Sequence, residues 1–323
     1  MFPLEQRRRF AKYTCGKMQD RLQEQRYELK YWLNEDKAFR VRQFVQSYLS
    51  LDEFSAKQAD LSYPTLSLYL DSVDLDTYWH TINGNKNRFK LRLRYYDDKP
   101  DSPVFFEIKR REDNVILKQR AGVKKNAVRM LLAGQLPAAE HLLNPSDPEA
   151  LVSLQHFSNY MHQIHAAPKI HIAYVREAYE NPGDNGVRVT FDRRVESAPQ
   201  HQPHLVARSP APHLVFGRMV ILELKFTGRY PNWFRDLVET FDCMQEGAAK
   251  YATGIFDKGE RWALEPHSED RLVESFLNAE SFPGLFGGSH QSMGDRLHDR
   301  LLMRTDRVAR FPLEPSRHHV VNH

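Results

Sequence analysis

The segment "RFKLRLRYY", residues 88–96, alternates strictly between basic and apolar or aromatic side chains up to Tyr95. Successive side chains of a β-strand point to opposite faces, so this segment has one cationic face and one apolar face. The cationic face carries Arg88, Lys90, Arg92 and Arg94, and the other carries Phe89, Leu91, Leu93 and Tyr95. The pattern predicts a strand that packs on a core with one side and gathers four like charges on the other.

Two later segments continue this pattern after short polar turns. The segment "VFFEIKRR", residues 104–111, puts Phe105, Glu107, Lys109 and Arg111 on one side, and "NVILKQR", residues 114–120, aligns Lys118 and Arg120. We therefore predict a three-strand meander whose basic residues lie in register with one another.

The net charge of the protein is concentrated in this region. Residues 86–129 contain fourteen Lys and Arg against six Asp and Glu, a net charge of +8, whereas the whole chain carries only +4. A solvent-facing stripe is the ordinary alternative for a half-buried antiparallel strand. However, four like charges on one face repel each other, and Arg and Lys both match the oxygens of a phosphate group. The charge pattern therefore favours phosphate binding over a simple exposed face.

A Glu-x-Lys triplet recurs three times, as Glu28 and Lys30, Glu107 and Lys109, and Glu223 and Lys225. One such triplet alone is typical of a solvated strand face with a cross-strand ion pair. In "VILELKF", residues 220–226, apolar residues occupy most of both alternating sets, so this strand is expected to be buried on both sides. Burying Glu223 and Lys225 costs on the order of several kcal/mol unless partners compensate, which favours a functional site.

The composition excludes several classes of protein. Hydrophobic residues make up 41% and charged residues 27% of the 323 positions, as in a globular protein. No apolar run approaches the roughly 20 residues that span a bilayer, and the charged N-terminus lacks the apolar segment of a secretory signal. With only Cys15 and Cys243, a disulfide framework and a Cys-rich zinc site are excluded, and we expect a cytoplasmic protein. A P-loop, a GxGxxG turn and an HExxH motif are absent from the sequence.

Strand and helix patterns alternate along the rest of the chain. Further strands are predicted at residues 25–33, 63–72, 169–179, 186–195 and 218–226, and helices after Asn34 and at residues 74–82, 124–134, 146–164, 230–244 and 246–256. Seven or eight mostly antiparallel strands interrupted by helices indicate an α+β fold around one large sheet or barrel. We expect a helical segment at residues 1–24, the main domain at 25–265, and a short helix with a poorly ordered tail at 266–323.

The ordered set "RYELKYWL", "SLYLDS", "RFKLRLRYY", "FFEIKRR", "KQR", "RVTFD", "VILELKF" and "AAKYATGI" resembles the VTC domain of polyphosphate polymerases. That domain is a branch of the triphosphate tunnel, or CYTH-like, superfamily, and the resemblance covers about residues 25–256. It implies an antiparallel β-barrel tunnel with helices packed outside. The basic lumen would hold ATP and a growing polyphosphate chain, together with Mn²⁺ or Mg²⁺.

The resemblance also implies roles for particular residues. Those expected to be catalytic are Lys30, Arg92, Arg94, Lys109 and Glu223, with Glu223 also holding the metal. Those that the resemblance implies to bind substrate are Lys118, Arg176, Arg188, Lys225 and Lys250. The charge pattern of the strands adds Arg88, Lys90 and Arg120 to the expected substrate-binding residues. Glu28 and Glu107 would either order the neighbouring bases or contact the metal.

The activity implied is transfer of the γ-phosphate of ATP onto polyphosphate with release of ADP. The hydrolytic branch of the superfamily opens with Glu-x-Glu-x-Lys, whereas Arg26 stands at the first acidic position here, which favours a transferase. ATP and polyphosphate are the expected partners, and neither nucleic acid nor a membrane segment is expected. The alternatives are a triphosphate or polyphosphate hydrolase using the same site, and a non-catalytic receptor for polyphosphate, inositol phosphates or nucleic acid.

Overall fold

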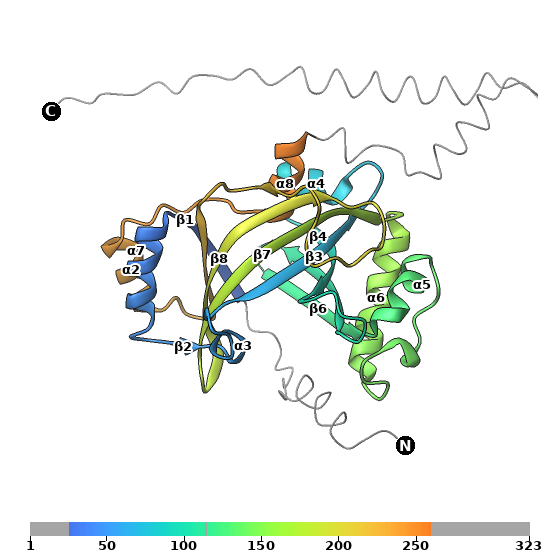
Figure 1. Ribbon diagram of the computed structural model, residues 1–323, viewed down its shortest axis with the longest axis horizontal. Coiled ribbons are helices and arrows are strands. Elements are labelled where there is room, and N and C mark those ends of the chain that lie inside the picture. Colours follow the sequence, from blue (N-terminus) through green and yellow to red (C-terminus); the bar gives the residue numbers. More distant parts are fainter. Residues whose placement is uncertain (1–25, 114, 260–323) are drawn as a thin grey trace, which may run out of the picture. The chain divides into compact units, whose positions relative to one another are not determined.

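An antiparallel sheet of ten strands organises the residues that the computed structural model describes, 26–113 and 115–259 (Figure 1). The predicted helical segment at 1–24 and the predicted helix and tail at 266–323 lie outside the described residues. The strands are β1 Arg26–Leu33, β2 Ser50–Leu51, β3 Tyr63–Asp71, β4 Arg88–Tyr95, β5 Val104–Glu112, β6 Val115–Val123, β7 Ala167–Asn181, β8 Asp184–Pro199, β9 His213–Leu214 and β10 Val220–Thr227. The predicted α+β class is confirmed.

Two of the longer helices begin at a residue whose side chain caps them. The helices are α2 Glu35–Val45, α3 Glu53–Ala56, α4 Asp76–Ile82, α5 Val128–Leu132, α6 Pro148–Gln163, α7 Asn232–Thr240 and α8 Lys250–Lys258, with 3₁₀ turns at Lys125–Ala127 and Ala139–His141. Asn34 Oδ1 accepts a hydrogen bond of 2.8 Å from the backbone N–H of Lys37, which fixes the start of α2. Asp147 Oδ1 likewise accepts from the backbone N–H of Ala150 at 2.9 Å, with Pro148 as the first residue of α6.

The sheet has the order β1-β10-β8-β7-β3-β4-β5-β6, with β2 paired to β7 and β9 paired to β8. In the meander, Arg92 lies opposite Glu107 and Glu107 opposite Arg120, while Lys90 lies opposite Lys109 and Lys109 opposite Lys118. The predicted register of the three basic strands is therefore confirmed. Because directly opposed residues share a face, these charges all lie on one side of the sheet.

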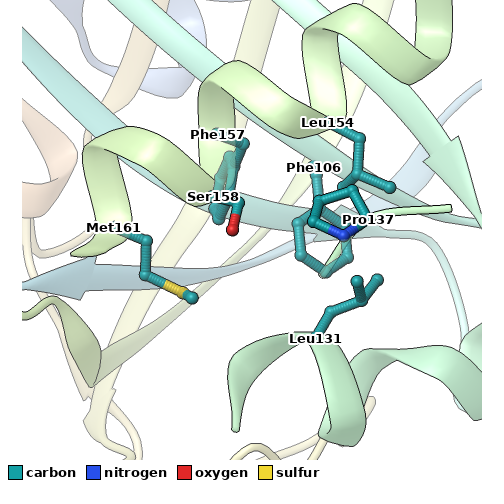
Figure 2. Close-up of a pocket in the computed structure, with 7 residues that line it drawn as sticks. All are labelled: Phe106, Leu131, Pro137, Leu154, Phe157, Ser158 and Met161. Carbon is teal, nitrogen blue, oxygen red and sulfur yellow. The ribbon is translucent and has the colours of Figure 1, made fainter. Parts of the chain in front are cut away.

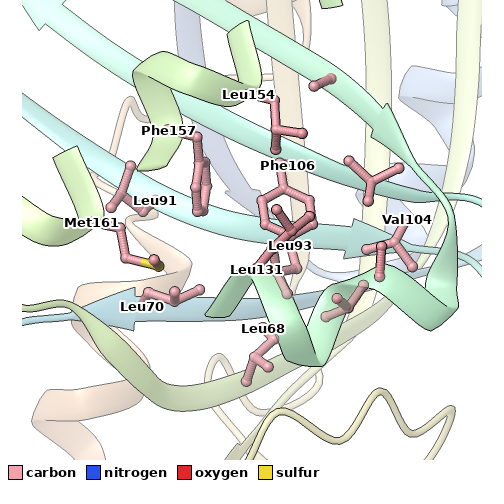
Figure 3. Packing of buried hydrophobic residues seen from close by; sticks show 14 of the residues in the cluster. Leu68, Leu70, Leu91, Leu93, Val104, Phe106, Leu131, Leu154, Phe157 and Met161 are labelled. Atoms are coloured by element: carbon pink, nitrogen blue, oxygen red, sulfur yellow. The ribbon is translucent and has the colours of Figure 1, made fainter. Parts of the chain in front are cut away.

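The opposite face of the meander packs against α5 and α6. Between these helices and β5 lies a small apolar pocket lined by Phe106, Leu131, Pro137, Leu154, Phe157, Ser158 and Met161 (Figure 2). It belongs to a larger core in which Leu68, Leu91 and Leu93 of the strands meet Phe157 and Met161 of α6 (Figure 3). The apolar half of the "RFKLRLRYY" pattern is thus buried as predicted.

A second core lies beneath α2 and α7, which lie together at the left of Figure 1. Val41 of α2 and Phe234 of α7 pack there against Phe191, Leu222 and Leu224 of β8 and β10. Both apolar cores lie on the same face of the sheet. Ala173 of β7 packs in the first core and Tyr179 of β7 in the second, and residues an even number apart along a strand point to the same face. The charged residues of β4, β5 and β6 lie on the opposite face, which is called the charged face below.

One helix covers part of the charged face, which differs from the expectation that all helices pack outside. Tyr251 and Ile255 of α8 pack against Ile170 and Ile172 of β7, and the Tyr251 ring stacks on Tyr69 of β3 with centroids 5.0 Å apart. Helix α4 joins this contact, and the two helices lie together at the top of Figure 1. One end of the charged face is therefore closed by α8.

The expected barrel is not confirmed, because β1 and β6 end the strand order and no ladder of backbone pairs joins them in the described part of the chain. The sheet nevertheless curls enough for β1 and β6 to make contact. A side-chain ion pair of 2.9 Å joins Glu28 of β1 to Lys109 of β5, the strand next to β6. Within the described residues, side chains and not backbone hydrogen bonds thus join β1 to this end of the sheet.

Candidate functional site

Glu223 of β10 lies at the centre of one cluster of bases. Its Oε2 atom is 2.6 Å from Lys225 Nζ and 3.0 Å from Arg176 Nη2, and its Oε1 atom is 2.8 Å from Lys250 Nζ and 3.8 Å from Lys30 Nζ. Burial alone would raise the pKa of this carboxyl, but Lys225, Lys250 and Arg176 hold it well below its usual range. Glu223 is therefore ionised, and its bases come from β1, β7, β10 and α8.

Asp192 of β8 is a second carboxylate in this cluster, and it was not among the residues predicted from the sequence. Arg176 binds it through two parallel hydrogen bonds of 2.7 Å, and Lys250 Nζ lies 2.7 Å from Oδ2. Burial would raise the pKa of Asp192, but Arg176 and Lys250 lower it. The alternation of Arg188, Thr190 and Asp192 along "RVTFD" was the signal that could have placed this acid on the charged face.

Glu107 of β5 is the centre of a second cluster. Its buried carboxylate lies 2.6 Å from Arg92 Nη2, 2.9 Å from Lys118 Nζ, 3.3 Å from Arg120 Nε and 3.6 Å from Arg94 Nε. Burial opposes ionisation, yet Arg92, Lys118 and Arg94 hold the pKa of Glu107 well below its usual range. Four bases thus share one carboxylate, which leaves positive charge uncompensated around Glu107.

Glu28 of β1 connects the two halves of the charged face. Its Oε1 atom is 3.1 Å from Lys30 Nζ and its Oε2 atom 2.9 Å from Lys109 Nζ. Lys30 also donates a hydrogen bond of 2.9 Å to the backbone oxygen of Ala248, just before α8. Burial would raise the pKa of Glu28, but Lys109 and Lys30 hold it well below its usual range. Glu28 therefore orders two of the predicted bases.

Lys90 of β4 lies among other cations. No carboxylate oxygen of the described residues is within 4.0 Å of its Nζ atom, and it lies 5.8 Å from the centre of the Tyr251 ring. Burial, reinforced by Lys30 and Lys109, lowers the pKa of Lys90 to about 7. Arg88, at the start of the same strand, donates instead to the backbone oxygen of Asn85. Lys90 is thus a base without a carboxylate partner among the described residues, and Arg88 lies at the margin.

The structure separates the two predicted arginines of β7 and β8. Arg176 contacts Glu223, whereas Arg188 pairs with Asp52 at 2.6 Å and Glu180 at 2.7 Å. Arg188 therefore lies on the charged face but outside the Glu223 cluster, held by carboxylates of its own. The other predicted bases are brought to one of the two clusters, to Glu28 or to the cations around Lys90.

Two tyrosines complete the site and were not foreseen. The Tyr69 hydroxyl accepts a hydrogen bond of 3.0 Å from Arg92 Nη1, and the Tyr174 hydroxyl accepts one of 3.3 Å from Arg94 Nη2. Each of these two guanidinium groups is therefore held by a tyrosine hydroxyl as well as by a carboxylate. Tyr69 alternates with Leu68 and Leu70 along β3, which was the available signal. The apolar pocket of Figure 2, by contrast, contains no charged residue and is not a candidate anion site.

Fold and site together define an antiparallel-sheet domain in which buried carboxylates bridge a dense set of bases on one face. Residues 25–256 match the VTC domain family. The chain belongs to the VTC domain family.

Relatives in fission yeast share part of their length with this chain. It is 23% identical over 184 residues to vacuolar transporter chaperone complex subunit 2 of Schizosaccharomyces pombe, which covers 52% of this chain and 25% of that protein. It is 21% identical over 253 residues to subunit 4 of the same complex, covering 67% of this chain and 34% of that protein. The chain thus spans between a quarter and about a third of the length of these curated relatives.

Among solved structures, a Bacillus halodurans protein provisionally described as an adenylate cyclase is 12% identical with a TM-score of 0.40, covering 70% of this chain and 94% of its own. The PH1819 protein of Pyrococcus horikoshii OT3 is 12% identical with a TM-score of 0.32, covering 77% and 99%. Scores below 0.5 add nothing to the family assignment. Within the described residues, no helix has the length and apolar character needed to cross a bilayer.

Proposed function

We propose that this protein is a phosphotransferase that moves the γ-phosphate of ATP onto a polyphosphate chain and releases ADP. Membership of the VTC domain family supports the proposal. The main structural evidence for it is the arrangement of bases on the charged face. We place the reaction in the cytoplasm, in keeping with the free, buried Cys243. The curled sheet would act as a tunnel when its two edges enclose the phosphate chain.

The bases exceed the carboxylates that they contact. Around Glu107 alone lie Arg92, Arg94, Lys118 and Arg120. Burying unpaired charge is costly, so a fold that keeps such a cluster gains from a polyanion that supplies the missing negative charge. A phosphate chain carries a charge at nearly every unit, and guanidinium groups bind its oxygens with two parallel hydrogen bonds.

Phosphoryl transfer requires in-line positioning and positive charge around the equatorial oxygens, and little covalent work from the protein. Arg92, Arg94 and Arg176 are fixed by carboxylates and tyrosine hydroxyls, so they are ordered before substrate arrives. In the proposed reaction a terminal oxygen of polyphosphate attacks the γ-phosphorus, the bond to the bridging oxygen breaks, and ADP leaves. The attacking oxygen belongs to the substrate, so no protein nucleophile is needed.

The residues present fit a divalent ion only if the substrate supplies most of its ligands. The described residues contain no group of three or more His, Cys, Asp or Glu side chains that could hold a metal ion. Mg²⁺ commonly binds through one or two carboxylates together with substrate phosphates, and Glu223 is an ionised oxygen ligand of that kind. Mn²⁺ or Mg²⁺ bound there would neutralise phosphate charge. Lys225 and Lys250, which now contact Glu223, would then be available to phosphate oxygens.

The proposal is tested by incubating the purified protein with ATP and Mn²⁺ or Mg²⁺ and separating the products on a gel. We expect ADP and long polyphosphate chains, and their loss in Arg176→Ala. Arg235→Ala, at an exposed position of α7, is the matched control and should keep the activity. Orthophosphate as the only product would indicate a hydrolase. Binding of tripolyphosphate without turnover in either metal would indicate a receptor.

A further inference from the structure

Two hydroxyl groups on β3 are buried without a partner. Thr65 is 0% exposed and Ser67 1% exposed, and neither hydroxyl has a hydrogen-bond partner within the described part of the chain. They alternate with Leu66 and Leu68, which lie in the apolar core behind the sheet. Both hydroxyls therefore belong to the charged face.

The strand register places these hydroxyls beside Arg94. Ser67 lies opposite Arg94 on β4, and Thr65 lies opposite Tyr174 on β7. The Nε atom of Arg94 is also buried without a hydrogen bond, and its nearest carboxylate oxygen, on Glu107, is 3.6 Å away. Two hydroxyls and one guanidinium N–H thus lie at neighbouring positions with unused donors.

These donors indicate which kind of ligand could bind at this position. Nearly all buried polar groups in proteins are hydrogen-bonded, so two hydroxyls without a partner among the described residues are expected to bond to water or to a bound ligand. The guanidinium can only donate, and a hydroxyl donates to an anion as readily as to water. An oxyanion therefore satisfies Thr65, Ser67 and Arg94 together, whereas a cation would be repelled by Arg94.

The position also indicates which part of a phosphate chain is bound. Ser67 lies opposite Ile172 of β7, and Ile172 is packed under α8. The charged face is closed on that side, so a chain cannot continue past it. We propose that Thr65, Ser67 and Arg94 form a subsite for the terminal phosphate of a phosphate chain. The subsite deepens the proposed function and rests on it.

Thr65→Val and Ser67→Ala test the subsite because each removes a hydroxyl with little change of shape. Calorimetry with orthophosphate and with tripolyphosphate should show a Kd about tenfold higher in each variant, the effect of one hydrogen bond to a charged group. The melting temperature without ligand should not fall, since no protein contact is lost. Thr65→Ser keeps the hydroxyl and should keep the affinity.

Ser197→Ala is the matched control. Ser197 is buried and its hydroxyl also lacks a partner among the described residues, but it lies on β8 against Gly254 of α8. The same chemical change there should leave both Kd values unaltered. If Ser197→Ala weakens binding as much as Ser67→Ala does, the effect is not specific to the subsite and the proposal is wrong.

Two further results would overturn the subsite. Unchanged Kd values in both Thr65→Val and Ser67→Ala would mean that only water occupies the position, and the proposed function would stand if Arg176→Ala still weakens tripolyphosphate binding. A lower melting temperature in both variants would mean that the hydroxyls have a structural role. Failure of the wild-type protein to bind tripolyphosphate would overturn the subsite and the proposed function together.

Discussion

Lys109 Nζ lies 2.9 Å from Glu28 Oε2, although β5 and β1 lie near opposite ends of the strand order. A flat sheet would hold these strands far apart, since neighbouring strands are about 4.8 Å from one another. The ion pair therefore shows that the sheet curls strongly. It also shows that β1 and β5 meet through charged side chains.

A double-mutant cycle with Glu28→Gln and Lys109→Met measures this link. The Lys109 side chain is 36% exposed, so solvent screens the pair, and we expect a coupling free energy of about 0.5 to 1 kcal/mol. Urea unfolding of the wild type, the two single variants and the double variant gives the value. Strictly additive effects would mean that this ion pair does not hold the sheet edges together.

Glu107→Gln should destabilise the unliganded protein by about 2 kcal/mol or more, because it leaves the buried Arg94 and the half-buried Arg92, together with two more exposed bases, without their shared carboxylate. Tripolyphosphate should recover more of the melting temperature in this variant than in the wild type, since the anion replaces the lost charge. Glu112→Gln, at a side chain that is 51% exposed, is the control and should change stability by less than about 0.5 kcal/mol. Equal stability of the two variants would rule out this role for Glu107.

Phosphate binding should weaken as the pH rises above about 7. Burial beside Lys30 and Lys109 lowers the pKa of Lys90 to about 7 in the free protein, and a bound anion raises it. Lys90 therefore takes up a proton on binding at pH 8, and this uptake becomes more costly as the pH increases. Calorimetry of tripolyphosphate binding in two buffers of different ionisation enthalpy measures the uptake.

Lys90→Arg is the control for this pH dependence because arginine stays charged at every pH used. The variant should take up fewer protons at pH 8 and should show a flatter affinity profile. Lys118 and Lys225, whose pKa values burial lowers to about 7 and about 8 despite Glu107 and Glu223, account for the uptake that remains. Identical proton uptake in Lys90→Arg and the wild type would show that Lys90 is not the titrating group.

Glu223→Gln and Arg92→Ala should separate chemistry from binding. Glutamine keeps the shape of Glu223 but removes the charge that a hard divalent cation requires, so turnover should fall by at least about 100-fold. Tripolyphosphate affinity should be kept or increased, because a negative charge is lost from a basic site. Arg92→Ala should weaken binding and turnover together. Wild-type turnover of Glu223→Gln at saturating metal would exclude Glu223 as the metal ligand.

Much of the charged face could be predicted because a strand repeats every two residues. The alternation in residues 88–95 was enough to assign Arg92 and Arg94 to one face and Leu91 and Leu93 to the core. The two-sided apolar pattern of "VILELKF" likewise predicted that Glu223 is buried. In each case the information lies within a single strand.

Features that depend on pairing between distant strands could not be predicted in the same way. The contact of Arg176 with Asp192 requires the register of β7 against β8, and that register shifts between Ala173 and Val175. A shift of this kind changes which side chains meet without leaving a mark in the local pattern. For the same reason neither the open edges of the sheet nor the unpaired hydroxyls of Thr65 and Ser67 followed from sequence.

The most direct test of phosphate transfer follows the label from ATP into product. The protein is incubated with a short polyphosphate primer, Mn²⁺ and ATP labelled with ³²P at either the γ or the α position. We predict that γ label enters the lengthening polyphosphate chains while α label remains in ADP, and that both products disappear in Arg176→Ala. Recovery of the γ label solely as orthophosphate, with the primer unlabelled, would contradict transfer of the γ-phosphate onto polyphosphate.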